Sequence, residues 1–232
     1  MPSPKLYINR KTARCIIHGP KELGGMSLHH IYTLQGSAKL KLFLGHLRLQ
    51  DRTGLLLHND LTQLQLISGT GKLILNLPAT DFPWIETGWL TSLWAVITDL
   101  NFKISYPNQW IPTLPRAGDA YLMETFSNRQ YSTTVMRTLN QCRLFLQVIT
   151  ISDTSSADGL YILPTVKEGA KLNTRVSKLE WPNQENPSKA DWIIWRSSLE
   201  TLGVRGSLVL PLDHGRHQHI SNGSTTITLQ HK

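Results

Sequence analysis

The chain has 232 residues, enough for one large domain or two small ones with cores of their own. Hydrophobic residues make up 40% of it and charged residues only 17%, so a wholly disordered chain is excluded. Residues 1–60 hold nine basic and three acidic residues and so carry +6 of the net charge of +8. Positive charge concentrated at one end favours a polyanionic partner such as nucleic acid, and ordinary solubilising charge is the alternative.

Cysteine usage and apolar patterning bear on the compartment. Cys15 and Cys142 are far apart in sequence, which gives no disulfide framework and fits a reducing environment. The first five residues lack the apolar run of a signal peptide. The longest apolar stretch, 85–100, is interrupted by polar residues and is too short to span a bilayer. We therefore expect a cytoplasmic or nuclear protein that is not secreted and has no membrane partner.

The N-terminal part of the chain is predicted to be a basic lead-in followed by two helices. Residues 1–28 contain several Pro and Gly residues and are predicted to be extended. An amphipathic helix follows over 29–50, and its apolar face comprises Leu40, Phe43, Leu44 and Leu47. A second helix is predicted over 53–68, with Gly69 as its C-terminal stop.

The rest of the sequence predicts shorter helices and a few strands. Alternating apolar and polar residues predict strands over 72–77, 102–106 and 225–229. Apolar periodicity and capping residues predict helices over 83–100, 118–126, 132–151 and 188–202. The fold class is therefore mainly α, an irregular helical domain with a few short strands. It covers residues 29–205, after the lead-in over 1–28 and before a flexible tail rich in His, Ser and Gly over 206–232.

Catalytic and metal-binding patterns are missing from the sequence. Two-metal polymerases and nucleases need closely packed carboxylates, yet no two acidic residues are adjacent. The nearest pair, Asp153 and Asp158, is interpreted as turn-forming side chains that end a helix. His214, His217 and His219 have a spacing that zinc can accept, but we interpret them as incidental surface residues. The sequence predicts no catalytic residue, no metal site, no cofactor and no small-molecule substrate.

One feature that could indicate a function lies on the predicted helix over 29–50. On a helical wheel, Lys41, Arg48 and Arg52 fall together about 100° from the apolar face. A basic stripe beside a buried face is the arrangement that a helix needs to follow phosphates. These three residues and the neighbouring Lys39 are the predicted nucleic-acid-binding residues. A merely solvated helix face is the alternative.

Three stretches of the sequence resemble a known family. The first is 19–28, Gly-Pro-Lys-Glu-Leu-Gly-Gly-Met-Ser-Leu. The second is 140–148, Asn-Gln-Cys-Arg-Leu-Phe-Leu-Gln-Val, which runs on to Ala-Asp-Gly at 157–159. The third lies within 181–196 and contains Trp-Pro, Pro-Ser, Asp-Trp and Trp-Arg. In this order they resemble the region that follows the polymerase domain in LINE-type (non-LTR) retrotransposon reverse transcriptases.

The resemblance implies binding or scaffolding of nucleic acid rather than catalysis. The family's polymerase uses a Tyr/Phe-x-Asp-Asp pair and an upstream Asp, which this sequence lacks, and that domain would lie before residue 14. Gly24 and Gly25 match a boundary motif, whereas Arg143 and Asp158 match without an assignable role. The implied partners are an RNA or DNA backbone and the polymerase domain of the parent element. The alternatives are a protein–protein interaction module, which exposed Trp residues would favour, and a remnant without a function of its own.

Overall fold

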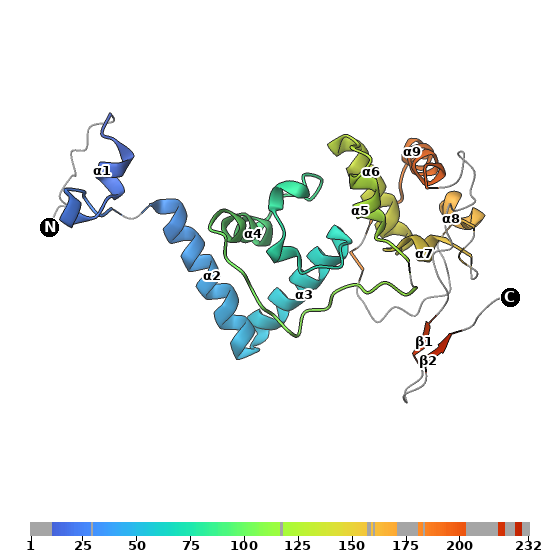
Figure 1. Cartoon of the computed structure of the whole chain (residues 1–232), viewed down its shortest axis with the longest axis horizontal. Coiled ribbons are helices and arrows are strands. Elements are labelled where there is room, and N and C mark those ends of the chain that lie inside the picture. The colour runs from blue at the N-terminus through green and yellow to red at the C-terminus, as the bar shows by residue number, and fades with distance from the viewer. Residues whose placement is uncertain are drawn as a thin grey trace. The chain divides into compact units, whose positions relative to one another are not determined.

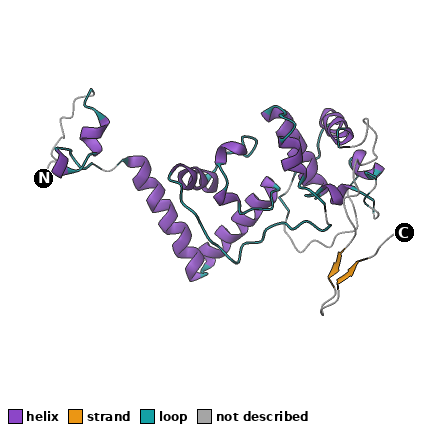
Figure 2. Cartoon of the chain, viewed as in Figure 1, coloured by secondary structure: helices purple, strands orange, loops and turns teal. Residues whose placement is uncertain are grey.

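The computed structural model describes residues 11–28, 30–116, 118–156, 159, 161–170, 181–182, 184–202, 218–220 and 226–228. As the sequence predicted, the chain is mainly helical (Figures 1 and 2). It divides into two compact units, residues 1–54 (unit 1) and residues 55–232 (unit 2). This division falls within the second long helix and not at residue 28. The predicted tail lies largely outside the described residues.

Unit 1 contains a short folded segment and one long helix. Its elements are α1 (Arg14–His18), the 3-10 helix η1 (Lys21–Leu23) and α2 (Ile31–Leu49). The helix predicted over 29–50 is therefore confirmed, and Phe43 and Leu47 on its apolar face are buried. Leu40 and Leu44 on the same face are half-buried.

The described part of the predicted lead-in is not extended. The amide of Met26 donates to the carbonyl of Ile16, at 2.7 Å, so the chain folds back on itself after α1. Gly24 has a left-handed φ of 78° at the end of η1. A Cβ atom on Gly25 would overlap the carbonyl of Gly19. The two glycines thus make a tight turn possible, because one adopts a backbone conformation that side chains disfavour and the other allows a close backbone approach.

The described elements of unit 2 are helices and one small hairpin. α3 (Arg52–Ser68) begins before the boundary and enters this unit. After it come η2 (Ile74–Asn76), η3 (Ala79–Asp81), α4 (Trp89–Asp99), α5 (Leu122–Ser127), α6 (Thr133–Leu146), α7 (Ile151–Thr154), α8 (Pro164–Lys167), α9 (Lys189–Glu200), β1 (Gln218–Ile220) and β2 (Thr226–Thr228). β1 and β2 pair antiparallel, with His219 opposite Ile227, and β2 confirms the strand predicted over 225–229.

The core of unit 2 is built around α5, α6 and α9. Leu139 and Cys142 of α6 are fully buried, as the predicted apolar face requires. Trp195 of α9 is also fully buried; its ring meets Phe126 edge to face at 6.1 Å, and its Nε1 donates to the carbonyl of Val166. Ser188 and Asp191 form the predicted capping box at the start of α9. Together these contacts join α5, α8 and α9 in one apolar cluster.

Two predicted strands are not strands, because side-chain amides provide the hydrogen bonds that a neighbouring strand would give. Gln65 donates to the carbonyls of Thr70 and Lys72 and accepts from the amide of Ile74, so residues 70–74 curl around one buried side chain. Asn76 donates to the carbonyl of Ile104 and accepts from its amide, at 2.8 and 2.9 Å. The alternating patterns over 72–77 and 102–106 therefore mark segments held by Gln and Asn.

Three predicted helices start or end elsewhere. The helix expected over 83–100 begins only at Trp89, and that over 118–126 begins at Leu122. The helix expected over 132–151 ends at Leu146, because Gln147 turns left-handed with a φ of 59°. Asp153 lies beyond this end and opens α7 as part of a capping box, so the interpretation of Asp153 as a helix stop is wrong. Asp158 lies outside the described residues.

Candidate nucleic-acid interface

Two of the predicted binding residues share one exposed face of α2. Lys41 and Arg48 are seven residues apart, which brings them within about 20° of each other around the helix and about 10 Å apart along it. Both side chains are exposed. Gly45 lies between them, and a Cβ atom there would meet nothing within 4 Å. The helix surface between the two cations is therefore open to a bulky anion.

Arg52 does not extend this face in the way the helical wheel assumed. α2 ends at Leu49, and Gln50 has a left-handed backbone with a φ of 51°. Arg52 is exposed and is the first residue of the next helix, α3. A single wheel therefore cannot relate its direction to that of Lys41 and Arg48.

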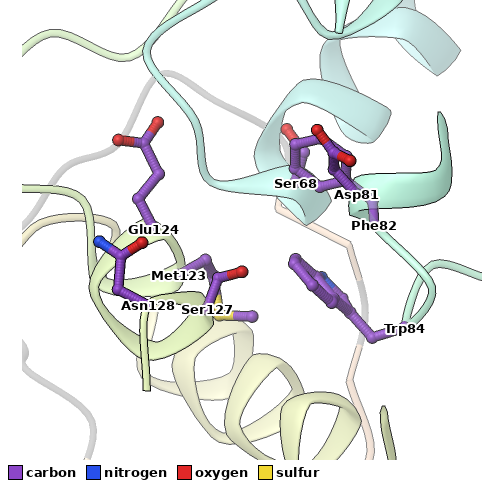
Figure 3. Close-up of a pocket in the computed structure, with 8 residues that line it drawn as sticks. All are labelled: Ser68, Asp81, Phe82, Trp84, Met123, Glu124, Ser127 and Asn128. Carbon is purple, nitrogen blue, oxygen red and sulfur yellow. The ribbon is translucent and has the colours of Figure 1, made fainter. Parts of the chain in front are cut away.

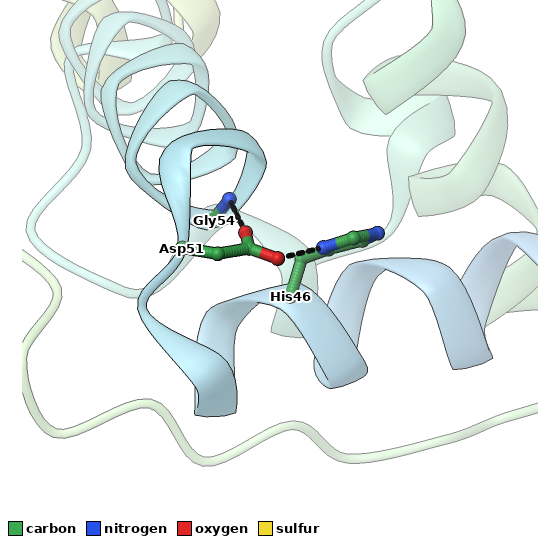
Figure 4. A network of polar contacts seen from close by, with 3 residues as sticks. All are labelled: His46, Asp51 and Gly54. Atoms are coloured by element: carbon green, nitrogen blue, oxygen red, sulfur yellow. Dashed lines mark hydrogen bonds and ion pairs between the residues drawn. The ribbon is translucent and has the colours of Figure 1, made fainter.

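The turn between the two helices is fixed by Asp51 (Figure 4). Its carboxylate accepts from the amide of Gly54 at 2.8 Å, which caps the start of α3, and lies 2.7 Å from Nδ1 of His46. The hydrogen bond from Gly54 and the contact with His46 lower the pKa of Asp51 below its ordinary value. Asp51, one of the two acidic residues of unit 1, therefore already has hydrogen-bond partners within its own chain.

Lys39 lies on a different side of α2 from the other predicted cations. It is nine residues from Arg48, which is half a turn around the helix, and its side chain is half-buried. Lys39 therefore stands beside the apolar face, and the predicted group of four is not one continuous patch.

The charge of unit 1 remains strongly positive after these contacts are counted. Residues 1–54 contain nine basic residues and two acidic ones, Glu22 and Asp51, a net charge of +7. Within the described ranges, Lys41, Arg48 and Arg52 form no ion pair with a carboxylate. Three cations on unit 1 are therefore available to an outside anion.

No protein family, no curated protein and no solved structure matches the chain.

A buried arginine, to which the sequence analysis assigned no role, connects α6 to the end of α3 in unit 2. Arg143 of α6 is fully buried, and its guanidinium donates to the carbonyls of Leu66 and Ile67 at 2.7 and 2.9 Å. These carbonyls lie in the last turn of α3, where no intrahelical amide remains to bind them. The guanidinium also donates to Oδ1 of Asn140 at 2.7 Å. Burial lowers the pKa of Arg143 to about 9, so it stays cationic at neutral pH.

Gly69 leaves room for this arginine. Its φ is +63°, which confirms the predicted stop of α3, and a Cβ atom there would lie 3.1 Å from the guanidinium carbon. A sequence signal for this arrangement existed, because Arg143 interrupts the predicted apolar face between Leu139 and Leu146. A charged residue at a buried helical position needs partners for its donors.

The buried carboxylates of unit 2 are bonded by their own chain. Asp153 accepts from the amides of Ile149 and Thr150, and Asp119 accepts from the amide of Ser152, at 2.8 to 3.0 Å. In the part of the chain that is described, no three His, Cys, Asp or Glu residues are grouped as a metal site would require. His214 and His217 lie outside that part, and only the backbone of His219 is described, in β1. Likewise, none of the described helices has the length and hydropathy to cross a membrane.

Proposed function

We propose that the chain is a non-catalytic nucleic-acid-binding segment, of the kind that follows the polymerase domain in LINE-type retrotransposon reverse transcriptases. Unit 1 contacts the phosphate backbone, and unit 2 is a helical scaffold that contacts the polymerase part of the parent element. The observation that carries the proposal is a set of exposed cations on unit 1, Lys41, Arg48 and Arg52, which pair with no carboxylate of the described residues. Binding through such contacts depends on charge and carries little sequence preference.

The alternative, an interaction module built on tryptophan, has less support from the burial of these side chains. Trp84, Trp94 and Trp195 are buried and belong to the interior of unit 2. Trp89 is 40% exposed. The three buried tryptophans therefore stabilise the fold, and an interface that needs several exposed indoles is not favoured.

Salt dependence of binding tests the proposal. The full chain should bind single-stranded RNA and DNA of unrelated sequences alike, and its affinity should fall steeply as salt rises. Changing Lys41, Arg48 and Arg52 together to Ala should reduce the slope of log affinity against log salt by roughly 2 to 3, because each lost phosphate contact removes about 0.7 to 0.9. The measurement is a fluorescence anisotropy titration at several salt concentrations.

A matched control removes equal charge from unit 2. Lys72, Lys103 and Lys189 are exposed and, within the described residues, form no ion pair, so changing all three to Ala should leave the slope nearly unchanged. If both triple variants change the slope equally, only net charge matters and the specific role of unit 1 is refuted. Circular dichroism verifies that each variant is folded.

Gly45 allows a sharper test of the same helix face. Gly45→Glu places a carboxylate four residues after Lys41 and three before Arg48, where it can pair with both. The slope should fall by about 1 to 2. Gly45→Ala should not change it, although both substitutions favour the helix by up to about 1 kcal/mol. A loss of binding in the Ala variant would show that the helix face itself, and not its charge, had been disturbed.

A further inference from the structure

Unit 2 contains a groove that is lined by both apolar and polar side chains. Its volume is about 560 Å³, and Leu64, Ile67, Ile85 and Leu144 line it from α3, α6 and the segment before α4. Asn140 also lines the groove and is 94% buried, since its exposed fraction is 6%. Concave sites that combine apolar side chains with a few fixed polar groups are typical of binding sites.

The orientation of the Asn140 amide is decided by Arg143. A guanidinium has only donors, so the atom of Asn140 that faces it must be the oxygen, and Oδ1 accepts from both Nε and Nη2. The amide nitrogen is consequently turned away from Arg143. Within the described residues, the side chain of Asn140 makes its hydrogen bonds through Oδ1 alone. The groove thus presents a rigid, unpaired donor to whatever occupies it.

A second cavity shares one lining residue, Trp84, with the groove (Figure 3). Its volume is about 260 Å³, and it is lined by the aromatic side chains of Phe82 and Trp84 and by the carboxylates of Asp81 and Glu124. In Figure 3 the indole of Trp84 points toward Met123 and Ser127 of α5. Carboxylates beside aromatic faces attract cations. The Nε1 of Trp84 is buried and has no acceptor among the described residues.

We propose that the two cavities together bind an extended peptide in which an apolar residue is next to a lysine or arginine. The apolar side chain occupies the groove, and a backbone carbonyl accepts from Nδ2 of Asn140. The neighbouring basic side chain lies between Asp81 and Glu124. Trp84 borders both cavities, so consecutive residues of one peptide can reach them.

The charges of the lining favour a peptide over nucleic acid. The two cavities include four carboxylates, those of Asp81, Glu86, Glu124 and Glu185, and one guanidinium, that of Arg137. Phosphates would be repelled here, whereas they are attracted to unit 1. The peptide site is therefore independent of the proposed nucleic-acid interface and can fail or hold without it.

NMR titration of the isotope-labelled full chain tests this site directly. The probes are acetyl-Leu-Lys-amide, acetyl-Leu-norleucine-amide, acetyl-Leu-Glu-amide and a thymidine hexanucleotide. The lysine probe should shift the Trp84 indole and the Asn140 side-chain amide resonances saturably, with a dissociation constant of about 1 mM. The norleucine probe should bind about threefold more weakly and the glutamate probe more weakly still.

Two substitutions test the two halves of the site separately. Asp81→Asn should weaken the lysine probe about threefold and leave the norleucine probe unchanged, because Asp81 is exposed and its carboxylate has no partner in the described residues. Asn140→Asp keeps an oxygen for Arg143 but removes the donor, so both probes should bind about tenfold more weakly. If this variant does not fold, Gln141→Trp fills the groove from α6 without touching Arg143 and should abolish binding of both probes.

The outcomes are decisive in either direction. Saturable shifts of Trp84 and Asn140 that are lost in Asn140→Asp or Gln141→Trp support the site. Absence of these shifts with every dipeptide overturns it. Resonance shifts with the hexanucleotide that exceed those with the lysine probe also overturn the proposal, because the site would then bind nucleic acid in preference to a peptide.

Discussion

Unit 1 and unit 2 differ in where their charges and their buried groups lie. Unit 1 has a net charge of +7 over 54 residues, and only a few of its described side chains, such as Phe43 and Leu47, are buried. Residues 55–232 contain 15 basic and 14 acidic residues, and they hold an apolar core together with buried, hydrogen-bonded charges such as Arg143. Substitutions of the exposed cations in unit 1 should therefore act on nucleic-acid binding, and substitutions of the buried charges in unit 2 should act on stability.

The largest effect on stability is expected at Arg143. Arg143→Met removes the donors that satisfy the last carbonyls of α3 and leaves Asn140 without its partner, in a fully buried site. The free energy of unfolding should fall by about 3 to 5 kcal/mol, as measured by urea denaturation. Arg137→Met, six residues earlier on α6 and exposed, is the control and should change the free energy of unfolding by less than about 0.5 kcal/mol. Equal effects would show that the buried network contributes no more than a surface charge.

The two cysteines, one in each unit, are expected to differ in the reactivity of their thiols. Cys15 of unit 1 is exposed, whereas Cys142 of unit 2 is buried and its pKa is raised to about 12 by desolvation. Because the thiolate is the reactive form, native Cys142 should react with a disulfide reagent at least about a thousandfold more slowly than Cys15 at pH 8. Stopped-flow labelling should detect one fast thiol in the native chain and two in urea. Two equally fast thiols in the native chain would contradict the rigid core of unit 2.

The smallest effect concerns the helix cap at Asp51. Its pKa is lowered in the folded chain, so its contribution to stability is complete above the unfolded value of 3.8 and is lost as the pH falls through the lower folded value. Asp51→Ser keeps a capping oxygen but has no charge to titrate. The unfolding temperature of the Asp51→Ser variant should therefore decrease less in acid than that of the wild type, because the variant lacks the titrating carboxylate. Identical acid profiles for wild type and variant would mean that the cap is not formed by the carboxylate.

Long amphipathic helices were the most predictable part of the fold. α2, α3 and α9 lie close to their predicted bounds, because apolar spacing and capping residues act within one element. The strands predicted over 72–77 and 102–106 were wrong, since local alternation carries no information about whether a neighbouring strand or a side chain such as Gln65 or Asn76 binds the backbone. The positive charge of the candidate interface could be predicted from the sequence. The end of α2 before Arg52 could not, because it depends on the left-handed backbone of Gln50.

The sequence by itself determined the helical character and the concentration of positive charge in the first quarter of the chain, because both follow from residue type and spacing. The tertiary structure decided which polar groups meet. Arg143 and Leu66 are 77 positions apart, and Thr70 and Glu124 are 54 apart, yet each pair is joined by a hydrogen bond of 2.7 Å. Such contacts depend on how helices pack, which no local pattern encodes. The unpaired amide nitrogen of Asn140 is likewise a consequence of packing, since only the position of Arg143 fixes its direction.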